Sequence, residues 1–317
     1  MKYLTIFSLL ISIVACKNIE KYNKKIKMKE LVPTQQVAKE KQYRYYIGLG
    51  VYLPFELYVN DILIKYGATG VSSAVELNPW LLRNGIHKVT IKFFPDVGGH
   101  TVVNMGKEQL PYRIDFNKVV INESRDIVKQ EKAIKLPLLT KDEDLPYFEQ
   151  SWDIEITDLP YVLEGWSNGQ DLSKWDQEVL EKKVVAYYEK LRRILNDGDA
   201  NTWMNNLTRR RKEETNVFDY EYDKENIRDS FEENSKKIRE YAKGNMIPLE
   251  DYKMKVYGKN NQLVALERFS SKDFEEWGET GKGWSPLIRI YDEEYLTSYP
   301  VKLYLPKGSD EFVIIRK

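Results

Sequence analysis

The sequence predicts two domains, an N-terminal antiparallel β-sandwich and a C-terminal α+β domain in which three helices precede a curved antiparallel sheet. Three observations predict them. Short alternating segments separated by turn residues fill residues 42–158, an apolar stripe at helical spacing opens residues 174–317, and the period returns to two after about residue 250. With 42% hydrophobic and 13% aromatic residues, the chain can form two cored domains of ordinary size.

The first fifteen residues have the features of a signal peptide. Met1 and Lys2 form a positive start, and the apolar run from Tyr3 to Val14 is shorter than the roughly 20 residues that cross a bilayer. Ile13-Val14-Ala15-Cys16 resembles the lipobox of bacterial lipoproteins. This resemblance implies cleavage before Cys16, acylation of its thiol and palmitate-type anchoring in the cell envelope.

Residues 16–41 are predicted to be the lipidated Cys16 followed by a flexible basic tether. Residues 17–41 carry eight lysines and three glutamates, whereas the remaining chain is mildly acidic. As a coil the tether spans on the order of 25–30 Å. Lys17 and Asn18 provide no acidic signal after the cysteine, which favours the outer membrane over the inner one. The sequence does not indicate on which face of the membrane the protein lies. The near-neutral balance of charge does not indicate a nucleic-acid partner.

The predicted sandwich begins near Tyr43. A hairpin is expected from alternation over residues 55–64 around the turn residues Asn60-Asp61. In residues 78–85, Asn at the cap, Pro at the first position and a closing Gly predict one helical turn with Asn78 as its cap. Further strands are expected at residues 89–93, 114–120 and 152–157.

A linker is predicted at residues 159–173, where proline, glycine and asparagine accumulate. A weak capping box, Ser173 and Asp176, precedes an apolar stripe from Leu180 to Leu195. Asn196-Asp197-Gly198 should end this helix and Asp199 should begin the next. A third helix is expected around residues 227–238.

Five strands of one antiparallel sheet are expected after residue 250, near residues 252–256, 263–269, 287–291, 301–305 and 312–315. Helices followed by a curved sheet, with the helix break at Asn196-Asp197-Gly198-Asp199, resemble the nuclear-transport-factor-like cone fold. The resemblance covers residues 174–317 and implies a pocket between helices and sheet, used for catalysis in some members and for binding in others. It transfers no catalytic residue.

No motif for catalysis, cofactor binding or metal binding is found, so catalytic residues, cofactors and metal ligands are all predicted to be none. The two histidines, His87 and His100, are not in a metal-binding arrangement and have no cysteine partner. The run Arg209-Arg210-Arg211-Lys212-Glu213-Glu214 is interpreted as a solvated segment whose charges compensate one another.

Aromatic residues are the one feature that indicates binding, with 22 Tyr, 7 Trp and 11 Phe. Trp152, Trp175 and Trp203 are predicted to be core residues. The candidate binding surface consists of Trp166, Trp277 and Trp284, which lie in glycine-rich or polar stretches; a packed turn covering the sheet edge is the alternative for the last two.

The leading hypothesis is a non-enzymatic lipoprotein that binds a protein partner, in its concrete form an immunity protein that neutralises a toxin in the periplasm. The alternative is an envelope lipoprotein that binds a glycan or another small ligand. A pocket hydrolase or isomerase ranks third, because residues 174–317 contain no histidine.

Overall fold

The structure is a computed structural model, and it describes residues 36–95, 99–102, 112–122, 126–138, 144–215, 217, 220, 222–269, 282–291 and 295–317. The predicted lipidation site Cys16, the tether up to residue 35 and Trp277 lie outside the described residues. Across these ranges, no helix combines the length and the apolar character needed to cross a membrane.

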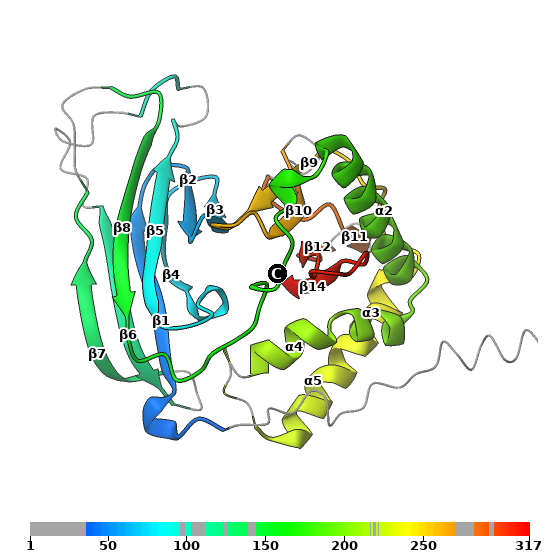
Figure 1. The fold of residues 1–317 in the computed structure, drawn as a ribbon, viewed down its shortest axis with the longest axis horizontal. Helices are drawn as coiled ribbons and strands as arrows, with labels where there is room; N and C mark the ends of the chain where they lie inside the picture. Colours follow the sequence, from blue (N-terminus) through cyan, green and yellow to red (C-terminus); the bar gives the residue numbers. More distant parts are fainter. Residues whose placement is uncertain are drawn as a thin grey trace, which may run out of the picture.

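The described chain is a β-rich α+β fold in which antiparallel sheets predominate (Figure 1). The N-terminal strands are β1 (Tyr43–Val51), β2 (Phe55–Val59), β3 (Ile62–Gly67), β4 (Val71–Glu76), β5 (Gly85–Phe93), β6 (Arg113–Ile121), β7 (Ile127–Lys135) and β8 (Phe148–Ile156). They form two four-stranded sheets, ordered β4-β1-β6-β7 and β3-β2-β5-β8, which enclose an apolar core. All pairings within both sheets are antiparallel, as the sequence predicted.

The hairpin between β2 and β3 forms as its turn residues predict. Asn60 and Asp61 have φ values of 51° and 63°, the left-handed conformation that a two-residue hairpin turn requires and that Asn and Asp tolerate. The alternating residues Phe55, Leu57 and Val59 are all buried.

The turn at Asn78 forms, but the predicted cap is wrong. The short 3-10 helix η3 (Asn78–Trp80) has Leu77 at its N-cap and no side-chain cap. Asn78 is fully buried; its Oδ1 accepts the Tyr45 N–H at 2.8 Å and its Nδ2 donates to the Tyr43 carbonyl at 3.1 Å. Its side chain therefore satisfies the backbone of β1 and is not available to cap the turn.

The C-terminal helices are α2 (Gln177–Asn196), α3 (Ala200–Asn206), α4 (Thr208–Glu214) and α5 (Lys224–Lys237), followed by a π-helical turn, η6 (Ile238–Ala242). The break after α2 is confirmed: Gly198 has a φ of 68°, and the Asp199 carboxylate accepts the Thr202 N–H at 3.0 Å. The predicted cap Ser173 is wrong, because Asp176 caps α2 by accepting the Val179 N–H at 3.0 Å.

The C-terminal strands are β9 (Tyr252–Tyr257), β10 (Leu263–Arg268), β11 (Ile288–Tyr291), β12 (Tyr295–Ser298), β13 (Lys302–Tyr304) and β14 (Val313–Arg316). Four of them form the sheet β14-β13-β10-β9, while β11 pairs with β12 in a separate ribbon. The expectation of a single sheet is therefore wrong: β11 pairs with β12, a strand not predicted from the sequence, and not with the strands of the main sheet.

Strand β10 is the wall shared by the two apolar cores. All six of its residues are buried, and successive side chains of a strand point to opposite faces. Leu263 and Ala265 belong to the core of the N-terminal sheets, whereas Val264 and Leu266 belong to the core beneath α2 and α3. The C-terminal sheet is thus packed on both faces.

Residues 159–173, predicted to be a linker, pack against both halves of the chain. The Leu163 N–H donates to the Leu82 carbonyl at 2.8 Å, and Gly169 forms a β-bridge with Pro306. Leu159 and Trp166 are buried in the first core. In Figure 1 this green segment crosses from β8 to the C-terminal half.

Candidate binding site

Helix α4 is built from a run of charges that compensate one another across one helical turn. Arg209 pairs with Glu213 at 3.2 Å, and Arg210 pairs with Glu214 at 3.0 Å, both at i,i+4 spacing. This part of the sequence interpretation is confirmed. The expectation that the run is solvated is wrong, because Arg210 and Glu213 are only 8% and 6% exposed.

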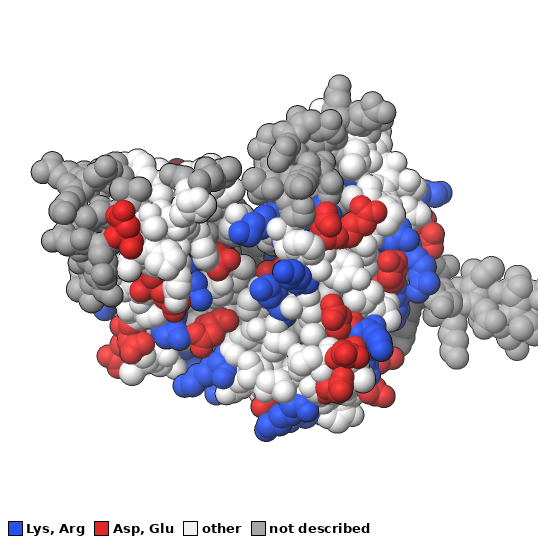
Figure 2. Space-filling view, turned by 90° about the horizontal axis from the view of Figure 1, so that it is seen from above, with Lys and Arg blue, Asp and Glu red and all other residues white. Residues whose placement is uncertain are grey.

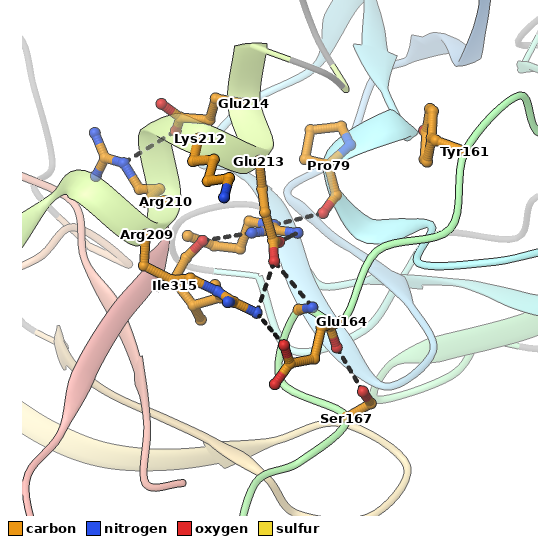
Figure 3. A network of polar contacts seen from close by, with 12 residues as sticks. Pro79, Tyr161, Glu164, Ser167, Arg209, Arg210, Lys212, Glu213, Glu214 and Ile315 are labelled. Atoms are coloured by element: carbon orange, nitrogen blue, oxygen red, sulfur yellow. Dashed lines mark hydrogen bonds and ion pairs between the residues drawn. The ribbon is translucent and has the colours of Figure 1, made fainter. Parts of the chain in front are cut away.

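Glu213 is buried because three donors meet its carboxylate. Its Oε1 accepts the Gly165 N–H at 3.0 Å and the Arg209 Nη2–H at 3.2 Å, while its Oε2 accepts from Arg316 Nη2 at 2.8 Å. Figure 3 shows Glu213 pointing from α4 towards the segment that carries Glu164. A buried carboxylate requires such a complete set of partners.

Arg316 reaches this cluster from β14 and is 2% exposed. Its Nε donates to the Pro79 carbonyl and its Nη1 to the Ile315 carbonyl, both at 2.6 Å. Its guanidinium lies 5.1 Å from the centre of the Trp166 ring, within range for a cation–π contact. The cluster therefore joins α4, β14, the connecting segment and the turn at Pro79.

A pocket of about 450 Å³ opens beside this cluster, between α2, the α3–α4 corner and β14. Its lining residues are Tyr187, Asn205, Asn206, Thr208, Arg209, Lys212, Phe312 and Val313. The volume is within the range of about 300–1,000 Å³ that is typical of ligand sites. None of the eight lining residues is acidic.

Two aromatic rings form the apolar wall of the pocket. Tyr187 on α2 meets Phe312 edge to face, with 5.8 Å between the ring centroids. Burial, with a smaller effect from nearby Glu311, raises the pKa of Tyr187 to about 12. Its phenol therefore stays protonated at neutral pH, and its hydroxyl donates to Asn206 Oδ1 over 3.5 Å.

Arg209 supplies fixed positive charge at the pocket. Burial opposes its charged form, but the carboxylates of Glu164 and Glu213 outweigh this and raise the pKa of Arg209. Both ion pairs, at 2.9 and 3.2 Å, use the Nη2 atom. Among the described residues, no hydrogen bond or ion pair involves Nη1 of Arg209, so this group retains N–H donors for a ligand.

The three tryptophans predicted to form a binding surface differ in how the structure places them. Trp166 is 7% exposed and packs against Trp80, with 6.4 Å between ring centroids. The prediction that Trp166 lies at the surface is wrong, because its ring packs against the buried guanidinium of Arg316. Trp277 lies outside the described residues. Trp284 is partly buried, and its carbonyl accepts the Arg268 N–H at 2.8 Å.

The tryptophans predicted to lie in the core are placed there. Trp203 is 4% exposed, and Trp152 and Trp175 are partly buried against the first and second cores. His87 is buried, whereas His100 is exposed. Within the described ranges, no three His, Cys, Asp or Glu side chains are grouped so that they could hold a metal ion.

No protein-family model, curated protein or solved structure matches the chain. The site is therefore interpreted from its own geometry. The pocket could not be predicted from the sequence, because its lining comes from three separate segments and contains no motif. The one local signal was the charge compensation within residues 209–214, which did not reveal what this segment covers.

Proposed function

We propose that the protein is a lipid-anchored binding protein of the cell envelope whose partner is another protein. Acylation of Cys16 would hold it on the membrane, with the outer membrane favoured, and residues 17–41 would act as the tether. In its concrete form, the protein is an immunity protein that captures a toxin arriving in the periplasm. We propose binding without catalysis, because the pocket lining contains neither a carboxylate nor a histidine to act as acid or base.

The architecture that we propose is a sandwich domain followed by a cone-like domain. Support comes from the pocket, which lies where α2 and the α3–α4 corner approach the end of the sheet at β14. The shared core at β10 supports a fixed arrangement of the two domains.

The pocket beside α4 is the observation on which the binding function depends. The buried Glu213–Arg316 pair joins α4 to β14, two elements that contribute lining residues, and the edge-to-face rings of Tyr187 and Phe312 pack in the wall itself. This packing supports a site that is already formed before a partner binds. Figure 2 shows Lys and Arg interspersed with Asp and Glu over the face in view. This pattern supports recognition by local contacts and does not favour a polyanion such as nucleic acid.

The immunity function is tested in co-culture, because parental cells provide the toxin. A deletion strain should be outgrown in contact with its parent, and the wild-type gene should rescue it. The pocket-filling variant Asn205→Trp should not rescue, whereas the matched variant Asn226→Trp, at an exposed position of α5, should. Equal growth of the deletion strain and the parent would count against the immunity function.

Anchoring is tested separately by growing cells with labelled palmitate. The wild-type protein should carry the label and partition into detergent, and Cys16→Ser should abolish both. An unlabelled, water-soluble mature protein would contradict the anchoring proposal.

A glycan ligand is the second candidate, and one observation favours it. The partly exposed Tyr187 ring lies beside the carboxamides of Asn205 and Asn206, and aromatic faces with neighbouring amides suit the apolar faces and hydroxyls of a sugar. A glycan array with the full-length protein tests this candidate; binding that Asn205→Trp abolishes would favour it over the protein partner.

A further inference from the structure

Building on the proposed function, we infer that the pocket beside α4 binds an acidic segment of the partner protein, a carboxylate side chain followed by an aromatic one. The carboxylate binds between Arg209 and Lys212, and the aromatic ring packs against Tyr187, Phe312 and Val313. Three observations carry the inference: the charge of the lining, the free donors of Arg209 and the apolar wall.

The charge of the lining favours an anion. Arg209 and Lys212 are the charged groups among the eight lining residues, and both are cationic. Lys190 adds a third cation, because its Nζ lies 5.7 Å from the centre of the Tyr187 ring. Three acidic side chains act on this lining from outside it: Glu164 and Glu213 pair with Arg209, and the exposed Glu311 acts on Tyr187.

The geometry of Arg209 favours a carboxylate. Glu164 and Glu213 both hold its Nη2 atom and so fix the plane of the guanidinium. Its Nη1–H groups are then held ready for an incoming acceptor, and a charged acceptor such as a carboxylate forms the stronger, charge-assisted hydrogen bond with them. Glu213 is 8% exposed at its side chain, whereas that of Glu164 is 53% exposed. A ligand carboxylate on Nη1 therefore displaces neither carboxylate, and the exposed Glu164 acts on it by charge repulsion.

The apolar wall favours a carboxylate with an aromatic neighbour over a free inorganic anion. Tyr187 and Phe312 present an edge-to-face pair, and Val313 lies beside them at the start of β14. A ring packed against this wall adds burial of apolar surface that phosphate or sulfate cannot provide.

The inference is tested by titrating the mature lipidated protein, held in nanodiscs, with the capped dipeptide acetyl-Glu-Phe-amide up to millimolar concentration and following binding by NMR. Acetyl-Gln-Phe-amide is the matched probe. The glutamate dipeptide should bind about tenfold more tightly, because the carboxylate forms charge-assisted hydrogen bonds that the amide does not. Equal affinity of the two probes would overturn the inference.

Two substitutions should change the affinity in opposite directions. Lys212→Glu should weaken binding of acetyl-Glu-Phe-amide by about tenfold or more, since it places a carboxylate in the lining. Glu164→Gln should strengthen binding several-fold, because it removes a negative charge beside Arg209 that repels the ligand carboxylate. Lys182→Glu, an exposed position of α2 outside the pocket, makes the same charge change as Lys212→Glu and should have no effect. A decrease with Glu164→Gln, or none with Lys212→Glu, would contradict the inference.

In the last part of the experiment, inorganic phosphate is added as a competitor of the bound dipeptide. Complete displacement of the dipeptide by an equal concentration of phosphate would assign the pocket to anions in general and overturn the peptide class. Failure of this inference is distinguishable from failure of the proposed function: dipeptide binding without protection in co-culture removes the immunity function alone, and protection that depends on Asn205 without dipeptide binding removes the inference alone.

Discussion

At the scale of single residues, Glu213 and Arg316 form a buried ion pair beside the pocket. Both side chains are at least nine-tenths buried, at 8% and 2% exposure, and their 2.8 Å ion pair links α4 to β14. Each charge is tolerated inside the protein only because the other is present. The cost of a substitution here is therefore set mainly by the partner that remains.

We predict that Arg316→Met destabilises the protein by about 3–5 kcal/mol, because it leaves the Glu213 carboxylate buried without its strongest partner. Urea unfolding of wild type and variant measures this free energy. The double variant Glu213→Gln/Arg316→Met should recover part of the loss. Arg113→Met is the control: the Arg113 side chain is 62% exposed in its ion pair with Asp115, so the change should cost less than about 1 kcal/mol. Equal costs at the two sites would contradict the prediction.

His87 makes the stability depend on pH. Burial lowers the pKa of His87 from 6.5, although its hydrogen bond to the Arg83 carbonyl opposes this. Its Nε2 lies 3.0 Å from that carbonyl and its Nδ1 lies 3.0 Å from Asn60 Nδ2. The neutral ring that donates from Nε2 and accepts at Nδ1 satisfies both contacts, whereas a protonated Nδ1 would face an N–H donor.

Because the folded state disfavours the protonated ring, the unfolded state binds more protons below pH 6.5. We therefore predict that this contribution to stability is fully present above pH 6.5 and decreases as the pH falls below that value. Urea unfolding at several pH values should show that His87→Gln removes part of the loss between pH 7 and pH 5. Parallel stability profiles for the wild type and the variant would show that His87 does not contribute.

At the scale of elements, helix ends are set by residues next to them in sequence. Gly198 ends α2 with a φ of 68°, and Gly244 follows η6 with a φ of 75°. The two glycines differ in surroundings: a Cβ on Gly198 would lie 3.0 Å from the Cβ of Lys243, whereas one on Gly244 would meet no atom within 4 Å. Alanine substitutions at these two glycines therefore distinguish the cost of backbone strain from the cost of steric crowding.

We predict that Gly244→Ala costs about 1–2 kcal/mol, the strain of a left-handed residue with a Cβ. Gly198→Ala should cost more, because its Cβ also displaces the Lys243 side chain. Chemical denaturation of both variants measures the difference. A smaller cost at Gly198 than at Gly244 would rule out crowding as a cause.

The elements predicted correctly from the sequence are those with local signals. The Asn60-Asp61 turn and the Gly198-Asp199 break depend on the conformations that these residues accept. Strand β7 was not anticipated, because eight of its nine residues are exposed and show no alternation. Helix α4 was expected to be solvated, because Arg316, the residue that buries Glu213, lies 103 positions away.

The candidate site could not be predicted from local sequence patterns either, because residues far apart in the sequence form it. Its wall joins Tyr187 on α2 to Phe312 before β14, and no spacing in the sequence places these residues together. Trp166 was expected at the surface because its neighbours are polar, yet its ring covers the guanidinium of Arg316.

At the scale of the whole molecule, the two halves share apolar packing. Leu263 and Ala265 of β10 lie in the same core as residues of the N-terminal sheets, and Val264 and Leu266 lie in the core of the helices. A cation also lies at the junction: Lys302 Nζ is 5.7 Å from the Trp80 ring centre and 5.6 Å from that of Tyr257. Burial lowers the pKa of Lys302, although nearby Glu267 opposes this.

Shared packing of this kind predicts that the described chain unfolds in one cooperative transition. Urea unfolding should give the same midpoint by far-UV circular dichroism, which follows the helices, and by amide exchange in β1 and β6. Leu263→Ala removes a side chain with 0% exposure and should lower the stability seen by both probes by the same amount, about 2–5 kcal/mol. Val128→Ala, at a residue of β7 that is 60% exposed, should leave both midpoints nearly unchanged. Two separate transitions, or a Leu263→Ala effect confined to one probe, would show that the halves fold independently and that β10 does not couple them.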